Sequence, residues 1–384
     1  DIDVNGVDIG RGGSGVVSNT ALGTQTLANN STGSGNSATG LQALYSNTTG
    51  SNNSASGYRA IYFNTTGSSN TATGRQALYS NTTGGNNSAH GYLALYSNTT
   101  GSNNAASGTV ALYSNTTGGN NAAIGHQALY SNTTASQNSA MGYQALYSNS
   151  TGANNVANGF QALYSNSTGA NNSATGYQAL RSNTTGGNNA ASGFQALYSN
   201  STGGNNAAIG YGALYSNTTG GNNAAIGYGA LLSNTTGSGN FGAAFRTSSS
   251  TYSPVFDPTT ENNRVVMGHT AVTNAYVQVA WTVVSDKRDK TQIEPMQHGL
   301  DFVEQLNPVS YKFRVDRDTE ETNGNKHYGF LAQDVLAIEG ENNVIVDNED
   351  PDKLRMTNEE LIPVLVNAIK ELKAEVETLK GKLA

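Results

Sequence analysis

The sequence lacks cysteine and has few prolines and few charged side chains. Among its 384 residues there is no cysteine, so disulfides contribute nothing to stability and the redox compartment cannot be read from the sequence. All six prolines lie at or beyond Pro254, and only 12% of the residues are charged. Disordered chains usually combine low hydrophobicity with high charge and abundant proline. This chain, which is 36% hydrophobic and has 46 glycines, is therefore not typical of disorder.

Acidic residues are missing from most of the chain. None occurs between Asp8 and Asp257, so the net charge of −7 belongs to the C-terminal third. Between residues 19 and 240 the only formal charges are those of Arg59, Arg75 and Arg181. Hard cations need carboxylate ligands, and glycosidases need paired carboxylates. Basic clusters are also missing, and no run approaches the roughly 18 apolar residues of a membrane span. We therefore expect no metal, no cofactor, no nucleic-acid binding and no membrane insertion.

What the sequence does contain is a repeat of 17 residues. A glycine, which we call the register glycine, recurs at this spacing from Gly23 to Gly227 without slippage. Alanine stands two residues before it in all thirteen repeats, Leu or Ile stands four after it, and Asn stands seven and thirteen after it. The "SNTTG" and "GNN" segments are turn signals, so we expect two short strands and two turns per repeat.

One repeat cannot fold alone, because ordering its backbone costs more than burying one Leu, one Tyr and a few Ala returns. Stacked repeats would give every strand a backbone partner above and below. Identical Asn amides one rung apart could then bond to each other as a ladder, and thirteen rungs would give a rod roughly 60 Å long. The sequence therefore predicts a mainly β fold built on a β-solenoid.

Aromatic residues also follow the period. Tyrosine stands five residues after the register glycine in ten of the thirteen repeats, from Tyr45 to Tyr215. Sequence variation concentrates at the positions directly before and after the register glycine, for example Ile124 and His126. The tyrosines can form an intramolecular stacking ladder, which we favour, or a surface on which sugar rings stack.

Stretches such as "NNAAIGYGALYSNTTGG", residues 205–221, carry a family resemblance. They resemble the left-handed β-roll heads of trimeric autotransporter adhesins, and resemble still more the glycine- and asparagine-rich repeats of bacteriophage tail-fibre proteins. The adhesin repeats are shorter, so the "SNTTGGN" turn should bulge further outward here. The resemblance implies a rod of three chains, whereas the spacing alone indicates a solenoid.

Composition changes near residue 240 and again near residue 285, and we divide the chain into four parts. We expect a lead-in over residues 1–22, the solenoid over 23–240, a β junction over 241–284 that contains Trp281, and a small α+β domain over 285–384. In the last part "SDKRDKTQI", "LNPVSYKFR", "HYGFLAQDV" and "LIPVLVNAIKELKAEVETL" follow one another in order. They are similar to the endosialidase-type intramolecular chaperone domain that ends phage tail spikes and tail fibres.

The resemblance implies that this domain trimerises, helps the upstream β-structure to assemble, and then cuts itself off. It places the nucleophile on Ser285, the base on Lys290 and the cut between Val284 and Ser285. Asp289 stands where the family usually has an apolar residue. Further motif residues, to which we assign supporting roles, are Asp286, Arg288, His327, Gly329, Phe330 and Gln333.

The chemistry of such a pair sets a condition. A serine attacks only when a base takes its proton, and a lysine amine is that base only when it is neutral. Because free lysine titrates near 10.4, burial or nearby cations such as Lys287 and Arg288 must assist. The alternative is that "SDKRDK" is an ordinary solvated charge run.

The last segment has a heptad pattern. Apolar residues alternate at spacings of three and four over Ile362, Leu365, Ile369, Leu372, Val376, Leu379 and Leu383. This predicts an oligomerising coiled coil, and the alternative is a helix packed on its own domain. A coil would fix the register of strictly repeated strands, in which a slip of one whole repeat costs little locally.

The resemblance leads us to expect that the chain is a segment of a homotrimeric phage tail fibre or spike, exposed on the virion. It would bind a host receptor, a surface glycan, and carry a C-terminal domain that makes one self-directed cut as a Ser-Lys endopeptidase. The alternative is a trimeric adhesin on a bacterial surface that binds glycans or matrix through exposed aromatic repeat positions.

Overall fold

The computed structural model describes residues 2–4, 7–13, 15–243, 258–268, 285–314, 320–340, 343–348 and 354–383. The chain divides into two compact units, Asp1–His269 and Thr270–Ala384, and each is described by itself.

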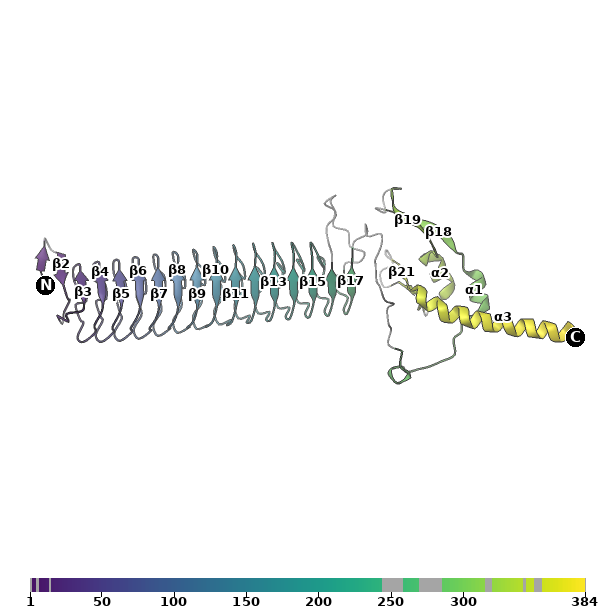
Figure 1. Ribbon diagram of the computed structural model, residues 1–384, viewed down its shortest axis with the longest axis horizontal. Helices are drawn as coiled ribbons and strands as arrows, with labels where there is room; N and C mark the ends of the chain where they lie inside the picture. The colour runs from purple at the N-terminus through teal and green to yellow at the C-terminus, as the bar shows by residue number, and fades with distance from the viewer. Residues whose placement is uncertain are drawn as a thin grey trace. The chain divides into compact units, whose positions relative to one another are not determined.

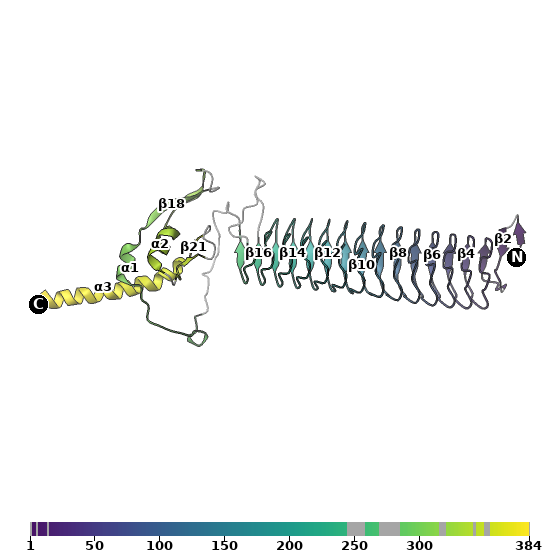
Figure 2. The ribbon, with the colours of Figure 1, turned by 180° about the vertical axis from the view of Figure 1, so that it is seen from behind.

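The first unit is a β-solenoid in which strands follow one another along a single ladder (Figures 1 and 2). Strands β1 to β3 pair antiparallel, and each strand from β3 to β17 pairs in parallel with the next. The strands are β1 (Ile2–Val4), β2 (Val7–Gly10), β3 (Thr20–Leu22), β4 (Ser37–Thr39), β5 (Ser54–Ser56), β6 (Thr71–Thr73), β7 (Ser88–His90), β8 (Ala105–Ser107), β9 (Ala122–Ile124), β10 (Ser139–Met141), β11 (Val156–Asn158), β12 (Ser173–Thr175), β13 (Ala190–Ser192), β14 (Ala207–Ile209), β15 (Ala224–Ile226), β16 (Phe241–Ala243) and β17 (Val265–Met267).

The solenoid prediction is confirmed, but the number of strands per repeat is not. Each repeat forms one three-residue strand, where two were expected. The segment after the register glycine cannot extend, because alternate residues have left-handed backbone angles, as at Gln144 (φ 53°) and Leu146 (φ 52°). It still bonds to the next rung: the Leu146 N–H donates to the Ala162 carbonyl at 3.0 Å. The second side of each rung is therefore a curled segment.

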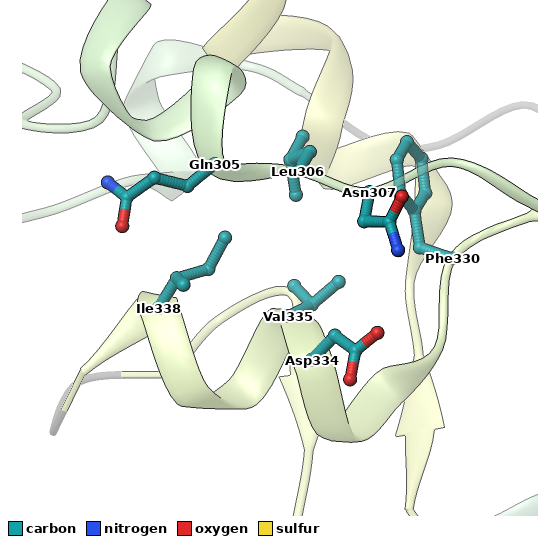
Figure 3. Close-up of a pocket in the computed structure, with 7 residues that line it drawn as sticks. All are labelled: Gln305, Leu306, Asn307, Phe330, Asp334, Val335 and Ile338. Carbon is teal, nitrogen blue, oxygen red and sulfur yellow. The ribbon is translucent and has the colours of Figure 1, made fainter.

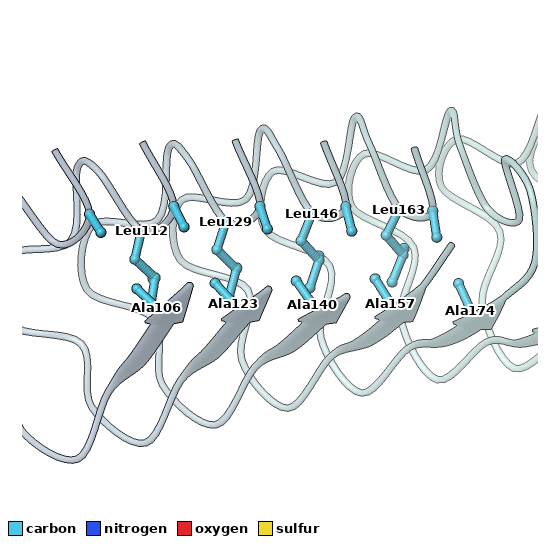
Figure 4. Packing of buried hydrophobic residues seen from close by; sticks show 14 of the residues in the cluster. Ala106, Leu112, Ala123, Leu129, Ala140, Leu146, Ala157, Leu163 and Ala174 are labelled. Carbon is cyan, nitrogen blue, oxygen red and sulfur yellow. The ribbon is translucent and has the colours of Figure 1, made fainter. Parts of the chain in front are cut away.

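The core of the solenoid is three columns of buried side chains, two of alanine and one of Leu or Ile. In β3 to β15 the middle alanine of each strand is buried, and it faces the Leu or Ile column of the curled segment (Figure 4). All thirteen residues of that column, from Leu27 to Leu231, have φ between 51° and 54°. Left-handed angles cost about 1 kcal/mol or more in a non-glycine residue, so burial of the large side chain offsets local strain at every rung.

Buried asparagines run beside this core, and the predicted amide ladder is confirmed. The Asn64 Nδ2 donates to the Asn47 Oδ1 at 2.8 Å and to the Gly67 carbonyl at 2.9 Å, and both Asn side chains are 0% exposed. In the second asparagine set, the side-chain oxygen of each residue accepts a hydrogen bond from the backbone of the next rung. For example, the Asn53 N–H donates to the Asn36 Oδ1 at 2.9 Å. In both sets the same hydrogen bond recurs from rung to rung, and it satisfies polar groups that are buried.

The register glycine is fixed by close backbone approach. Gly142 has φ 137°, and a Cβ built on it would lie 2.4 Å from the carbonyl oxygen of Gly159 in the next rung. Only glycine allows this angle and this approach together.

Aromatic rings form two columns along the rod. The inner column, five residues after the register glycine, stacks from Tyr45 to Tyr164 with ring centroids 5.1–5.3 Å apart. This confirms the intramolecular ladder. Burial and the neighbouring phenols raise the pKa of Tyr113 and of Tyr147 above the ordinary value. Arg181 replaces one ring, and its guanidinium lies 5.3 Å from the Tyr164 centroid and 5.8 Å from that of Tyr198.

The ladder continues beyond residue 240, where the repeats were expected to end. β16 pairs with β15 at the usual offset, and β17 pairs with β16 at Phe241↔Val265. The last rung is therefore longer than the others. Part of the expected junction belongs to the solenoid, whereas Trp281 and Val284 lie outside the described residues.

The second unit is a small α+β assembly. Its elements are η1 (Lys287–Asp289), α1 (Leu300–Gln305), β18 (Val309–Arg314), β19 (Thr322–Gly329), α2 (Ala332–Glu339), β20 (Val346–Asp347), β21 (Arg355–Met356), η2 (Asn358–Glu360) and α3 (Leu361–Leu383). β18 pairs with β19, and β20 with β21, both antiparallel. The buried core is Phe302, Val335, Ile345, Val346, Leu361 and Val364. Figure 3 shows Gln305 and Leu306, at the end of α1, facing Val335 and Ile338 of α2.

Two carboxylates in this unit accept hydrogen bonds from backbone N–H groups. Glu339 is buried and accepts hydrogen bonds from the N–H groups of Val344, Ile345 and Val346. Glu371 of α3 accepts the Leu300 N–H at 2.6 Å, at the start of α1. The Glu339 bonds are local, whereas the Glu371 bond joins segments 71 residues apart and ties α1 to α3.

Candidate functional site: a serine-lysine pair and an exposed helix seam

A short turn brings Ser285 and Lys290 together. Asp286 caps the single-turn helix η1 and accepts the Arg288 N–H at 2.9 Å. Across this turn the Lys290 Nζ lies 2.7 Å from the Ser285 Oγ and donates a hydrogen bond to it. The sequence motif named these two residues, and the structure places them within reach of proton transfer.

Two of the charges next to the pair, Asp286 and Arg288, bind each other. The Arg288 Nε lies 3.1 Å from both carboxylate oxygens of Asp286. The Arg288 side chain and N–H lower the pKa of Asp286 below its ordinary value, and Asp286 raises the pKa of Arg288. The Arg288 charge is therefore directed to Asp286, which weakens the expected assistance of Arg288 to Lys290.

Ser285 and Lys290 are exposed. Burial favours the neutral form of an amine, and the described residues of this chain do not bury the pair. The carbonyl that would be attacked belongs to Val284, which lies outside the described residues.

The second group of motif residues lies on β19 and α2. His327 stacks near Tyr311, at 5.8 Å between ring centroids, and meets Phe313 edge-on at 5.4 Å. Gly329 is tightly placed, since a Cβ there would come 3.2 Å from the Tyr311 ring. Within the described residues, no hydrogen bond or ring contact joins this group to Ser285 or Lys290.

The remaining two motif residues differ in exposure. Phe330 packs against the core of the second unit, and Gln333 is exposed in the first turn of α2. Beside them lies an open groove of about 450 Å³, which sequence reasoning did not identify. Its lining includes Tyr311, Phe313, Phe330, Leu331, Leu354 and Met356. The alternation in "VSYKFR", which puts both aromatic rings on one face of β18, was the available signal.

Helix α3 has two apolar faces. One face, with Leu361, Val364 and Ala368 buried, packs on its own unit. The heptad residues occupy another face and are 39–88% exposed: Ile362, Leu365, Ile369, Leu372, Val376, Leu379 and Leu383. Packing on the helix's own domain thus accounts for its first turns and leaves the predicted seam uncovered.

No helix among the described residues is long and apolar enough to cross a membrane. Within the same residues, no group of three or more His, Asp or Glu is arranged to hold a metal ion.

Comparison with known proteins gives one match. Residues 285–345 match the peptidase family described as chaperone of endosialidase. No curated protein and no solved structure matches the chain. The match begins at Ser285 and supports an architecture of a repeat rod followed by a C-terminal chaperone domain. It ends before α3, so the interpretation of that helix depends on the structure itself.

Proposed function

We propose that the chain forms a homotrimeric fibre of the phage tail-fibre or tail-spike type, exposed on the virion. Its C-terminal domain would set three chains in register and then cut itself off between Val284 and Ser285. The observation that carries the proposal is the Ser285–Lys290 pair at 2.7 Å, standing at the first residue of the chaperone match.

The exposed seam of α3 supports a trimer. Ile or Val alternates with Leu along most of the seam, which is the composition of coiled-coil core positions. Such a row is costly in water, and three copies would bury it against one another. The rod needs this association of the three α3 helices because its rungs are near-copies. Three chains shifted by one repeat would form almost the same contacts.

The proposed cut is a single event. The Ser285 Oγ attacks the Val284 carbonyl carbon while Lys290 takes its proton, and the bond from that carbon to the Ser285 nitrogen breaks. The nitrogen takes the proton from Lys290, which leaves an ester between Val284 and the Ser285 side chain. Water then opens the ester and leaves a free amino terminus at Ser285.

The exposure of the pair implies when the cut occurs. In a single chain the Lys290 amine is in contact with water. In the proposed trimer, neighbouring copies would cover the pair and exclude water from it. Cleavage therefore follows assembly, and the chaperone is released only from a correctly registered fibre.

The test is intact-mass analysis of the purified chain with native sizing. We expect a fragment beginning at Ser285 in the unaltered protein, and none in Ser285→Ala or Lys290→Ala, both still trimeric. Ile369→Glu, in the seam, should prevent both trimer and cut, whereas Lys370→Glu, exposed on the same helix outside the seam, should prevent neither. An Ile369→Glu monomer that still cuts itself would show that assembly is not required. A Lys290→Ala protein cut at the same rate would remove the pair from the mechanism.

We further propose that the rod binds a host surface glycan. The observation behind this is the row of exposed rings directly after the register glycine, including Tyr92, Tyr143, Tyr177 and Tyr211. The same row favours the second candidate, a bacterial surface adhesin. A virion-attachment domain upstream in the full-length protein would support the fibre, and a secretion signal there would support the adhesin.

A further inference from the structure

The residues directly after the register glycine form the outer column of the rod. From His126 onward its rings stack without interruption, with centroids 4.9–5.4 Å apart, through Tyr143, Phe160, Tyr177, Phe194, Tyr211 and Tyr228. A sugar ring stacks on the face of an aromatic ring, and inside this column each face is covered by the next ring. Most of the column therefore offers only ring edges to a glycan.

Two residues interrupt the outer column between rings, Arg75 and Thr109. The Arg75 guanidinium fills its place, since it lies 5.7 Å from the Tyr58 ring centroid and 5.9 Å from that of Tyr92. On the N-terminal side of Thr109 stands Tyr92, whose other face carries this guanidinium. On its C-terminal side stands His126, whose other face is covered by Tyr143 at 5.4 Å. Thr109 supplies no ring, so the facing sides of Tyr92 and His126 have no aromatic partner in the described structure.

The rod itself is continuous at this rung. The inner column passes it without a break, with Tyr96–Tyr113 at 5.2 Å and Tyr113–Tyr130 at 5.3 Å. β8 and β9 pair in the usual register. Tyr92 and His126 are therefore held two rungs apart, about 10 Å. Elsewhere in the column that space holds one aromatic ring at about 5 Å from each neighbour.

The inner column shows the contrasting case. Arg181 interrupts that column, but its guanidinium lies over both neighbouring rings and fills the place of the missing one. The short side chain of Thr109 is exposed and cannot do the same. Of these three breaks, at Arg75, Thr109 and Arg181, only the one at Thr109 leaves room for a ring from outside.

The side chains around Thr109 indicate the chemistry of that ring. The glutamine ladder, seen in Gln144 donating to Gln127 at 2.8 Å, is replaced here by Leu93 and Val110. Hydroxyl groups of Ser107 and Thr109 are exposed at the same rung. A guest with apolar faces and a polar edge, which describes a pyranose, fits this combination better than an apolar aromatic side chain does.

Charge favours one kind of pyranose. Arg75 lies one rung beyond Tyr92 and Arg59 lies one rung further, while no acid occurs from residue 9 to residue 256. The local field is positive and unopposed, so it attracts anions. A sugar that carries a carboxylate would gain from it.

We propose that the Thr109 rung is a sugar-binding slot in which a hexopyranose ring, preferably a carboxylated one, inserts between Tyr92 and His126. The slot rests on the proposed glycan-binding role of the rod and gives that role a location. The proposed slot also explains why a small residue, Thr109, stands between two aromatic residues of the outer column.

Saturation-transfer NMR with methyl β-glucuronide and methyl β-glucoside tests the slot on the full-length chain, with the His126 ring protons as a second reporter. We expect transfer to both glycosides, stronger for the glucuronide, and a shift of the His126 signals. Thr109→Tyr completes the column and should weaken binding at least tenfold, whereas Thr109→Ser keeps the gap and should stay within twofold. Tyr177→Thr opens an equivalent gap between Phe160 and Phe194 and should add a second site per chain.

Equal binding by Thr109→Tyr and the unaltered chain, or no transfer to either glycoside, would overturn the slot. Equal transfer to the two glycosides would overturn the preference for a carboxylate. These outcomes are independent of fibre assembly, because the Thr109→Tyr chain should still trimerise and cut itself. If it neither assembles nor cuts, and the unaltered chain does not either, the proposed function fails instead.

Discussion

The two units of this chain are stabilised in opposite ways. In the solenoid the same kinds of long-range bond recur from rung to rung, as in the Asn64–Asn47 bond and the bond from Leu146 to Ala162. In the second unit the long-range bonds join unlike residues, such as Glu371 to Leu300 and Asn367 to His298. The first kind of contact can be repeated indefinitely, and the second occurs once.

This difference explains why the two units stand in one chain. Repeated contacts give length and rigidity, but they do not distinguish one register from another. Contacts that occur once specify a single arrangement, and they can therefore fix the register in which the repeats begin to assemble. The comparison predicts that the same substitution has different consequences in the two units.

Glycine gives the largest contrast. Gly142→Ala puts a Cβ at 2.4 Å from a backbone oxygen and forces an angle of φ 137° on a non-glycine residue. Left-handed strain and overpacking together should lower the local stability by roughly 2–6 kcal/mol. Hydrogen–deuterium exchange should show faster opening of the rungs on both sides.

Gly381→Ala in α3 is the matched control. A Cβ there meets nothing within 4 Å, and alanine favours helix by up to about 1 kcal/mol over glycine. Exchange in the last turns of α3 should slow slightly. Equal and small effects at both glycines would contradict the close rung packing described above.

The sequence predicted the solenoid well because its period is strict and its Asn positions never vary. It did not predict the single strand per repeat, because nothing in the residue types of "YQAL" shows that Leu146 would take a left-handed angle. The heptad spacing of α3 was readable, but Leu361, Val364 and Ala368 had to be seen in three dimensions before the two faces could be separated.

The candidate site was predictable to a similar extent. The order of motifs named Ser285 and Lys290, while the Asp286–Arg288 pair depends on the geometry of one short turn. The significance of Thr109 could not be predicted either. It requires knowing that the residues around it form a stack.

Asparagine gives the second contrast. Asn166 is buried and bonds to Asn149 and to the Gly169 carbonyl, and it accepts from Asn183. Asn166→Ala leaves several buried polar groups unsatisfied, so we expect a loss of about 2–4 kcal/mol. Asn367→Ala in the second unit removes two bonds from a half-buried side chain that water can replace, and about 1 kcal/mol should be lost. Exchange rates in each unit measure the two changes, and a larger loss for Asn367→Ala would reverse the comparison.

The smallest predicted effect concerns the one exception in the Leu column. Ile61 has φ 52°, like the leucines at the equivalent positions, but a β-branched side chain is the least suited to a left-handed angle. Leu keeps the volume and removes the branch at Cβ, so Ile61→Leu should stabilise its rung by about 0.5–1 kcal/mol. The reverse change, Leu78→Ile one rung away, should destabilise by a similar amount. Exchange at the amides of Leu44 and Leu78 reports the first variant. A slower rate there would show that identical rungs are preferred even where the side chains differ only in branching, whereas a faster rate would mean that Ile61 fills its place better than a copy of its neighbours does.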